Sequence, residues 1–190
     1  MIYVGVDDPY LYRGSCVLKN RAGIRDPTLL EQFEAISTAT RAEEPLPTGQ
    51  FSKTHFMAVH RHLFQDDYAW AGRPRRNRIS KGSSMFCFPE HIHAALDLLF
   101  QWLRSKNRLR GLDAHEFVRG LAHFLAELNA IHAFREGNGR TQLIFAFLIS
   151  VDAGYPLNLE RLDERAFLSA MIESFSGHEE SLAAELASLI

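Results

Sequence analysis

HAFREGNGR, residues 132–140, places a base, a candidate metal ligand, a glycine-rich turn and a cation within nine residues. Apolar stretches of helical period lie on both sides of it, and the second of them runs through Ile149. Packing alone does not explain so dense a polar cluster between two such stretches. By its chemistry, the segment is suited to hold a polyphosphate and to deprotonate a group beside it.

The chain around this segment has a dominant helical period. The spacing predicts a helix over residues 28–43 that carries Leu29, Leu30, Phe33 and Ile36 on one side, and a second helix capped by Ser52. Further helices are predicted from Pro89, from the N-cap Asp113, from about Gly139, and finally from about Asp163 and Glu179. The sequence therefore predicts an all-α fold.

Length and composition indicate one soluble domain over residues 1–190, with 46% apolar and 23% charged residues. We distinguish an N-terminal segment, 1–50, from the polar segment with its helix start, 132–143. The net charge of −2 predicts no direct nucleic-acid partner. Two cysteines form neither a disulfide framework nor a zinc pattern. With no signal peptide and no apolar run long enough for a bilayer, we expect a cytoplasmic protein without a membrane partner.

The region 70–89 departs from the helical pattern, because it is basic and is interrupted by glycine and proline. Arg78–Ser80 and Ser84–Phe86 are candidates for two short strands that turn at Lys81–Gly82. One interpretation is a solvated loop. The other is a hairpin whose open edge accepts an extended target segment by strand addition.

His132 is the candidate base of the polar segment. It ends the helix that begins at Asp113, and a histidine in that position often only caps or packs. An imidazole titrates near neutrality, however, so it can take a proton from a hydroxyl at little cost. Phe134 is expected to be a core anchor that fixes the loop.

Gly137, Asn138, Gly139 and Arg140 are the candidate phosphate-binding residues. The glycines allow close backbone approach, and the first N–H groups of the following helix favour anions. Arg140 can grip phosphate oxygens with a bidentate fork.

Glu136 is the candidate metal ligand, because an unpaired carboxylate beside bound phosphate would repel it. A Mg²⁺ ion held by one carboxylate and by phosphate oxygens resolves that conflict. The alternative for Glu136 is a salt bridge to Arg135 or Arg140. Together these residues predict transfer of a phosphate-linked group, without deciding which phosphorus is attacked.

The segment resembles the signature of the Fic family, His-x-Phe-x-Asp/Glu-Gly-Asn-Gly-Arg. The resemblance implies a helical Fic fold with a β-hairpin flap in the region 70–89, where Arg78, Ile79, Ser80, Lys81 and Gly82 would dock the target. It further implies transfer of AMP from ATP, with Mg²⁺, to a serine, threonine or tyrosine hydroxyl of a target protein. A lysine in place of Gly139 would mark a kinase-like variant.

The likeness extends over most of the chain. Segments such as Asp8–Tyr12, Val17–Asn20, Phe64–Asp66 and Trp70–Gly72 are similar to compact bacterial Fic toxins. This implies a toxin of a toxin–antitoxin pair that acts on type II topoisomerase subunits. Secreted relatives modify small GTPases, which is the alternative target class.

Three departures from the family pattern bear on activity and regulation. Ala133 replaces a common proline, which should loosen the loop only slightly. Leu143 replaces the second arginine of the family's extended pattern, Gly-Asn-Gly-Arg-x-x-Arg. This departure leaves open the alternative that the chain is a catalytically weak nucleotide-binding interaction module. Neither Ser176–Ser181 nor Thr40–Pro45 completes the inhibitory pattern Ser/Thr-x-x-x-Glu-Gly/Asn. We therefore expect a separate small helical antitoxin to supply the inhibitory helix; the alternative is a chain that has no such inhibition.

Overall fold

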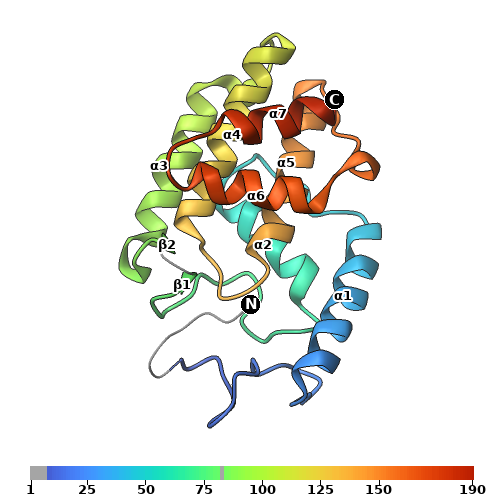
Figure 1. Cartoon of the computed structure of the whole chain (residues 1–190), viewed down its shortest axis with the longest axis vertical. Coiled ribbons are helices and arrows are strands. Elements are labelled where there is room, and N and C mark those ends of the chain that lie inside the picture. The colour runs from blue at the N-terminus through green and yellow to red at the C-terminus, as the bar shows by residue number, and fades with distance from the viewer. Residues whose placement is uncertain (1–7, 82–83) are drawn as a thin grey trace. The chain divides into compact units, whose positions relative to one another are not determined.

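The computed structural model describes residues 8–81 and 84–190, and helices dominate it (Figure 1). The prediction of an all-α fold with a short hairpin is confirmed. The α-helices are α1 (Pro27–Glu43), α2 (Lys53–Phe64), α3 (Ile92–Ser105), α4 (Ala114–Ile131), α5 (Asn138–Ala153), α6 (Glu164–Ser174) and α7 (Glu180–Ser188). The 3₁₀ turns η1 (Pro89–His91), η2 (Asn107–Leu109) and η3 (Leu159–Arg161) and the strands β1 (Ser80–Lys81) and β2 (Ser84–Met85) complete the elements.

Short polar side chains set where these helices begin. Asp26 accepts a hydrogen bond from Leu29 N at the start of α1, and Ser52 accepts one from His55 N at the start of α2. Asp113 and Asp163 cap α4 and α6. Each cap satisfies a backbone N–H that has no partner within the helix. The predicted starts at Ser52, Asp113 and Asp163 are therefore confirmed.

The chain divides into two compact units. The first contains residues up to 92 and residues 133–141, and the second contains residues 93–132 and 142–190. In the first unit α1 packs on α2, whereas in the second α6 and α7 pack on α4. The aromatic side chains Phe100, Phe124 and Phe145, from α3, α4 and α5, meet in the core of the second unit. No helix of the described residues is long and apolar enough to cross a membrane.

The buried face of α1 differs from its apolar side. Leu29 and Ile36 are 57% and 69% exposed, whereas Leu30, Glu34 and Thr38 are buried. These three residues follow the i, i+4, i+8 spacing of one helical face. Polar contacts to other parts of the first unit, described below, account for the burial of Glu34 and Thr38.

The hairpin lies in the region 70–89 as predicted, but β1 begins two residues later than predicted, and β2 begins at Ser84 as predicted and ends one residue earlier. β1 and β2 pair antiparallel, with Ser80 opposite Met85 and Lys81 opposite Ser84. Ile79, predicted as a strand residue, precedes β1 and is buried. Its side chain belongs to the core, whereas Ser80 and Lys81 of β1 are half-buried. Gly82, where the turn was predicted, lies outside the described residues.

Candidate functional site

His132 is the last residue of the second unit before the chain enters the loop that leads to α5. It caps α4 in a left-handed conformation (φ 47°, ψ 60°), which is unusual for a residue with a Cβ. Its Nδ1 lies 3.3 Å from the carbonyl oxygen of Asn129. Because a carbonyl only accepts, this contact places the ring proton on Nδ1 and the ring lone pair on Nε2. That tautomer is the one that a base acting through Nε2 requires.

The loop after His132 rests on aromatic rings of the first unit. Phe134 is fully buried, and its ring stacks on the His60 imidazole at 3.7 Å between centroids. His60 Nδ1 accepts from Gly72 N, so Nε2 carries the proton and donates to the carbonyl oxygen of Glu136 at 3.0 Å. Burial lowers the pKa of His60 to about 3, so its imidazole is neutral. Phe134 is thus the expected anchor, and His60 fixes the loop backbone beside it.

Asn138 closes the same loop with both ends of its amide. Its Oδ1 accepts from Phe134 N at 2.9 Å, and its Nδ2 donates to Phe134 O at 2.8 Å. The side chain is therefore occupied in shaping the loop. A phosphate role for Asn138 would fall to its backbone N–H at the start of α5.

The two glycines of the loop have different surroundings. Gly137 has φ +78°, and a Cβ there would lie 2.2 Å from Phe64 Cζ, so both conformation and packing require glycine. A Cβ at Gly139 would meet no heavy atom of the described residues within 4 Å. Packing within the described chain gives no reason for glycine at 139. The open space beside Gly139 leaves the backbone accessible at the start of α5.

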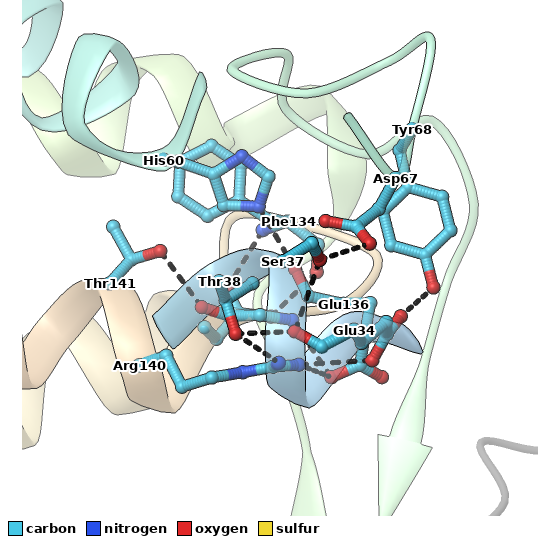
Figure 2. A network of polar contacts seen from close by, with 12 residues as sticks. Glu34, Ser37, Thr38, His60, Asp67, Tyr68, Phe134, Glu136, Arg140 and Thr141 are labelled. Atoms are coloured by element: carbon cyan, nitrogen blue, oxygen red, sulfur yellow. Dashed lines mark hydrogen bonds and ion pairs between the residues drawn. The ribbon is translucent and has the colours of Figure 1, made fainter. Parts of the chain in front are cut away.

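Arg140 and Glu136 meet beside this turn, together with two residues of α1 (Figure 2). Arg140 Nη2 lies 3.1 Å from Glu34 Oε2 and 3.6 Å from Glu136 Oε1. Arg140 Nη1 donates to Thr38 Oγ1 at 3.3 Å. The sequence-based alternative for Glu136, an ion pair with Arg140, is thus present. Arg135 instead pairs with Asp8 at 2.6 Å, and both of these side chains are buried.

The electrostatics of this cluster centre on Glu34. Burial raises the pKa of its carboxyl to about 7, and the charge of Glu136 acts in the same direction, whereas Arg140 opposes them. Burial likewise raises the pKa of Asp67, whose carboxylate accepts from Ser37. Glu34, Asp67 and Glu136 thus share this cluster with the Arg140 guanidinium, and the raised pKa values reflect burial together with the crowding of carboxyl groups.

Glu136 fits a hard cation that takes most of its ligands from elsewhere. Its Oε1 accepts from Gly137 N at 2.8 Å, and its side chain is 31% exposed. No group of three or more acidic, histidine or cysteine side chains within residues 8–81 and 84–190 forms a metal cage. One carboxylate with phosphate and water oxygens is the donor set that Mg²⁺ commonly uses. These residues therefore fit Mg²⁺ bound together with a polyphosphate.

Arg75 clamps the base of the flap. Its guanidinium donates to the carbonyl oxygens of Asn77 and Cys87, one on each leg of the hairpin. Its backbone N–H donates to Ala133 O at 2.9 Å, which ties the flap to the polar loop. The buried Arg75 is therefore structural, so the basic region is more than a solvated loop.

The predicted docking residues lie at different depths in this flap. Arg78 is exposed, and its guanidinium lies over the Phe88 ring. Ile79 is buried, Ser80 and Lys81 form β1, and Gly82 is outside the described residues. Ser80 and Lys81 are therefore the members of this set that present strand backbone.

Comparison with known proteins settles the family. The family model described as Fic/DOC matches residues 50–150, which include the flap, the polar loop and most of α5. The chain belongs to the Fic/DOC family. A relative, y4lH of Sinorhizobium fredii, bears the name "Probable protein adenylyltransferase" and is 47% identical over 189 residues. The alignment covers 99% of this chain and 98% of that relative.

Solved Fic domains share the fold. The N-terminal Fic domain of a VirB-translocated Bep effector of Bartonella quintana, with bound ADP, is 30% identical with a TM-score of 0.88. The alignment covers 95% of this chain and 94% of that one. BepC of Bartonella tribocorum, with bound AMPPNP, is 26% identical with a TM-score of 0.86, and 95% of each chain is covered. The predictions of the family, the Fic fold and the enzyme class, a protein adenylyltransferase, are confirmed.

Several residues that shape the loop were not predicted from the sequence. Asp8 and Glu34 are distant in sequence from the arginines they contact, and no sequence pattern links them to those arginines. His60 sits at i+4 from Phe56 and i−4 from Phe64 on an apolar helix face, which is the one signal that its ring would be buried.

Proposed function

We propose that the chain transfers AMP from ATP to a serine, threonine or tyrosine hydroxyl of a target protein. The observation that carries this is the start of α5, where helix-terminal N–H groups, Arg140 and Glu136 lie together. Similar Fic domains hold ADP and AMPPNP, which supports a nucleoside polyphosphate as the ligand. Gly139, in place of the lysine of kinase-like variants, favours transfer of AMP.

The proposed reaction is a displacement at the α-phosphorus. The target hydroxyl oxygen forms a bond to this phosphorus while the bond to the bridging oxygen of the β-phosphate breaks, and pyrophosphate leaves. His132 Nε2 takes the hydroxyl proton. Arg140 and the N–H groups of residues 138–140 hold the phosphate oxygens and stabilise their charge. Mg²⁺ beside Glu136 would supply further charge neutralisation at those oxygens.

Labelled nucleotides test this assignment. With ATP labelled on the α-phosphate, the wild-type chain should label proteins of a host lysate, and ATP labelled on the γ-phosphate should not. His132→Ala should reduce transfer by about 10²–10⁴-fold, the usual contribution of a positioned base. Its ATP affinity in calorimetry should stay near that of the wild type, since other groups hold the phosphates.

The outcomes separate the alternatives. Label from the γ-phosphate would indicate a kinase. ATP binding without any label would favour the nucleotide-binding interaction module that Leu143 suggests. Transfer by His132→Ala at the wild-type rate would remove His132 from the role of base.

We further propose that the enzyme is a toxin whose targets are type II topoisomerase subunits, held in check by a small helical antitoxin. The resemblance to compact Fic toxins supports this, as does the incomplete inhibitory pattern at Ser176–Ser181 and Thr40–Pro45. Mass spectrometry of the host proteome after expression reads both the added group and its acceptor. Adenylylated small GTPases in place of topoisomerase subunits would support the effector-like alternative.

A further inference from the structure

Arg140 is held by neighbours that come from α1 and α2. Nη2 is 3.1 Å from Glu34 Oε2, Nη1 donates to Thr38 Oγ1, and Cζ lies 4.6 Å from the centre of the Phe64 ring. These hydrogen bonds use two of the five N–H groups of the guanidinium within the described part of the chain. The side chain stays 38% exposed, so donors remain for a ligand.

The two acceptors on α1 are themselves fixed. The Tyr68 hydroxyl donates to Glu34 Oε1, which leaves Oε2 directed at Arg140 (Figure 2). The Thr38 hydroxyl donates to the main-chain oxygen of Glu34 at 2.5 Å, so its oxygen can only accept from Arg140. The side chain of Glu34 is 12% exposed. Arg140 therefore meets acceptors that are set before any ligand binds.

An arginine that grips a phosphate loses rotamer freedom, and this loss weakens binding unless the side chain is already held. We propose that Glu34 is a positioning residue that holds Arg140 in the orientation that receives the phosphates, an inference that rests on the proposed function. Glu34 lies before residue 50, outside the region that the family model matches. The phosphate site accordingly depends on α1, and a segment restricted to 50–150 would lack its Arg140 support.

Three substitutions of Glu34 test the positioning role. The readouts are two constants, the dissociation constant for ATP and the KM for ATP. Glu34→Ala should raise both constants about tenfold, the scale of one hydrogen bond to a charged group. Glu34→Gln should stay within about twofold of wild type, since its amide oxygen accepts from Arg140 and its NH₂ donates to Tyr68. Glu34→Asp, one methylene shorter, should fall between. The value of kcat should change little, because less ATP is bound but the bound ATP keeps the same position.

Glu31→Ala is the matched control, since Glu31 is an exposed carboxylate on the same helix. It should leave both constants unchanged. A double-mutant cycle then isolates the pair: Glu34→Ala combined with Arg140→Ala should bind ATP no more weakly than Arg140→Ala alone. A general loss of structure would instead weaken the double mutant further.

The results decide separately on the two proposals. If Arg140→Ala leaves ATP affinity unchanged, the phosphate site of the proposed function is misplaced. If Arg140→Ala weakens ATP but Glu34→Ala does not, the positioning role alone is overturned. Tighter ATP binding by Glu34→Ala would also overturn it, because Glu34 would then compete with phosphate. Should Glu34→Ala not fold, Glu34→Asp equal to wild type is the contradicting result.

Discussion

Two glycines in one turn illustrate how a single residue type meets two demands. We expect Gly137→Ala to destabilise the chain by more than about 1 kcal/mol, since alanine disfavours positive φ and its Cβ would meet the Phe64 ring. Gly139→Ala should keep or raise stability, by up to about 1 kcal/mol from helix propensity, but weaken ATP binding. Thermal unfolding and calorimetry on both variants check this. Unchanged ATP affinity in Gly139→Ala would show that the phosphates do not approach that backbone.

Glu34 makes stability depend on pH in the nucleotide-free protein. Its carboxyl keeps its proton up to about pH 7 when folded but loses it from about 4.5 when unfolded. The contribution of this carboxyl to the free energy of unfolding is therefore complete below the unfolded pKa and is lost as the pH rises through 7. Glu34→Gln lacks this loss. Between pH 5 and 8 the wild type should lose on the order of 2 kcal/mol of unfolding free energy relative to that variant.

Urea unfolding of the two proteins across this pH range measures the difference. Glu31→Gln serves as the control. Glu31 is exposed on the same helix, so this variant should follow the wild-type curve of unfolding free energy against pH. Parallel curves for wild type and Glu34→Gln would contradict the prediction.

At the scale of elements, local signals were enough to predict the helices and several of their starts, although α3 begins at Ile92, after a 3₁₀ turn at the predicted start Pro89. Asp113 and Asp163 cap the turns that follow them in sequence, and the hairpin lies between breakers at Gly72 and Pro89. The buried face of α1 was not predictable in the same way. Glu34 is buried because it meets Arg140, which is 106 residues away, and a polar face buried by such a pair has no apolar period.

The residues of the candidate site likewise divide into those that local sequence predicts and those that it does not. The segment 132–140 could be predicted because its chemistry is contiguous in sequence. Its supports could not, because Asp8, Glu34 and His60 reach it only through the tertiary structure. Asn138 shows the limit within the motif itself, since its side chain turns out to brace the loop.

The hairpin gives a prediction about target recognition. If β1 docks the target through main-chain hydrogen bonds, Lys81→Pro should reduce target modification, because proline removes an N–H and fixes φ. Lys81→Ala keeps the N–H and should retain transfer. ATP affinity should stay normal in both, since neither change touches the loop at 137–140. Equal loss of transfer in both variants would indicate recognition by the lysine side chain instead.

At the scale of the whole molecule, two of the carboxylates that contact the motif arginines come from outside the matched region 50–150. Asp8 pairs with Arg135, and Glu34 pairs with Arg140. The family signature is therefore supported by an N-terminal segment that the signature does not contain.

The last prediction concerns regulation of the intact chain in a host cell. Expression of the wild type should arrest growth, and expression of His132→Ala should not, because the arrest would require transfer. A small helical protein bearing Ser/Thr-x-x-x-Glu-Gly/Asn should restore growth when expressed together with the wild type. Its glutamate cannot pair with Leu143, so Arg140 or backbone donors must receive it, since a buried carboxylate needs a partner to offset its desolvation.

Glu180→Gly is the variant that decides between an external and an internal inhibitor. Glu180 is an exposed residue in the first turn of α7, within the segment that comes nearest to the inhibitory pattern. With an external inhibitor, Glu180→Gly and wild type should arrest growth equally, as colony counts would show. Arrest that appears only with Glu180→Gly would identify α7 as the inhibitor, because removing that carboxylate would then release the phosphate site.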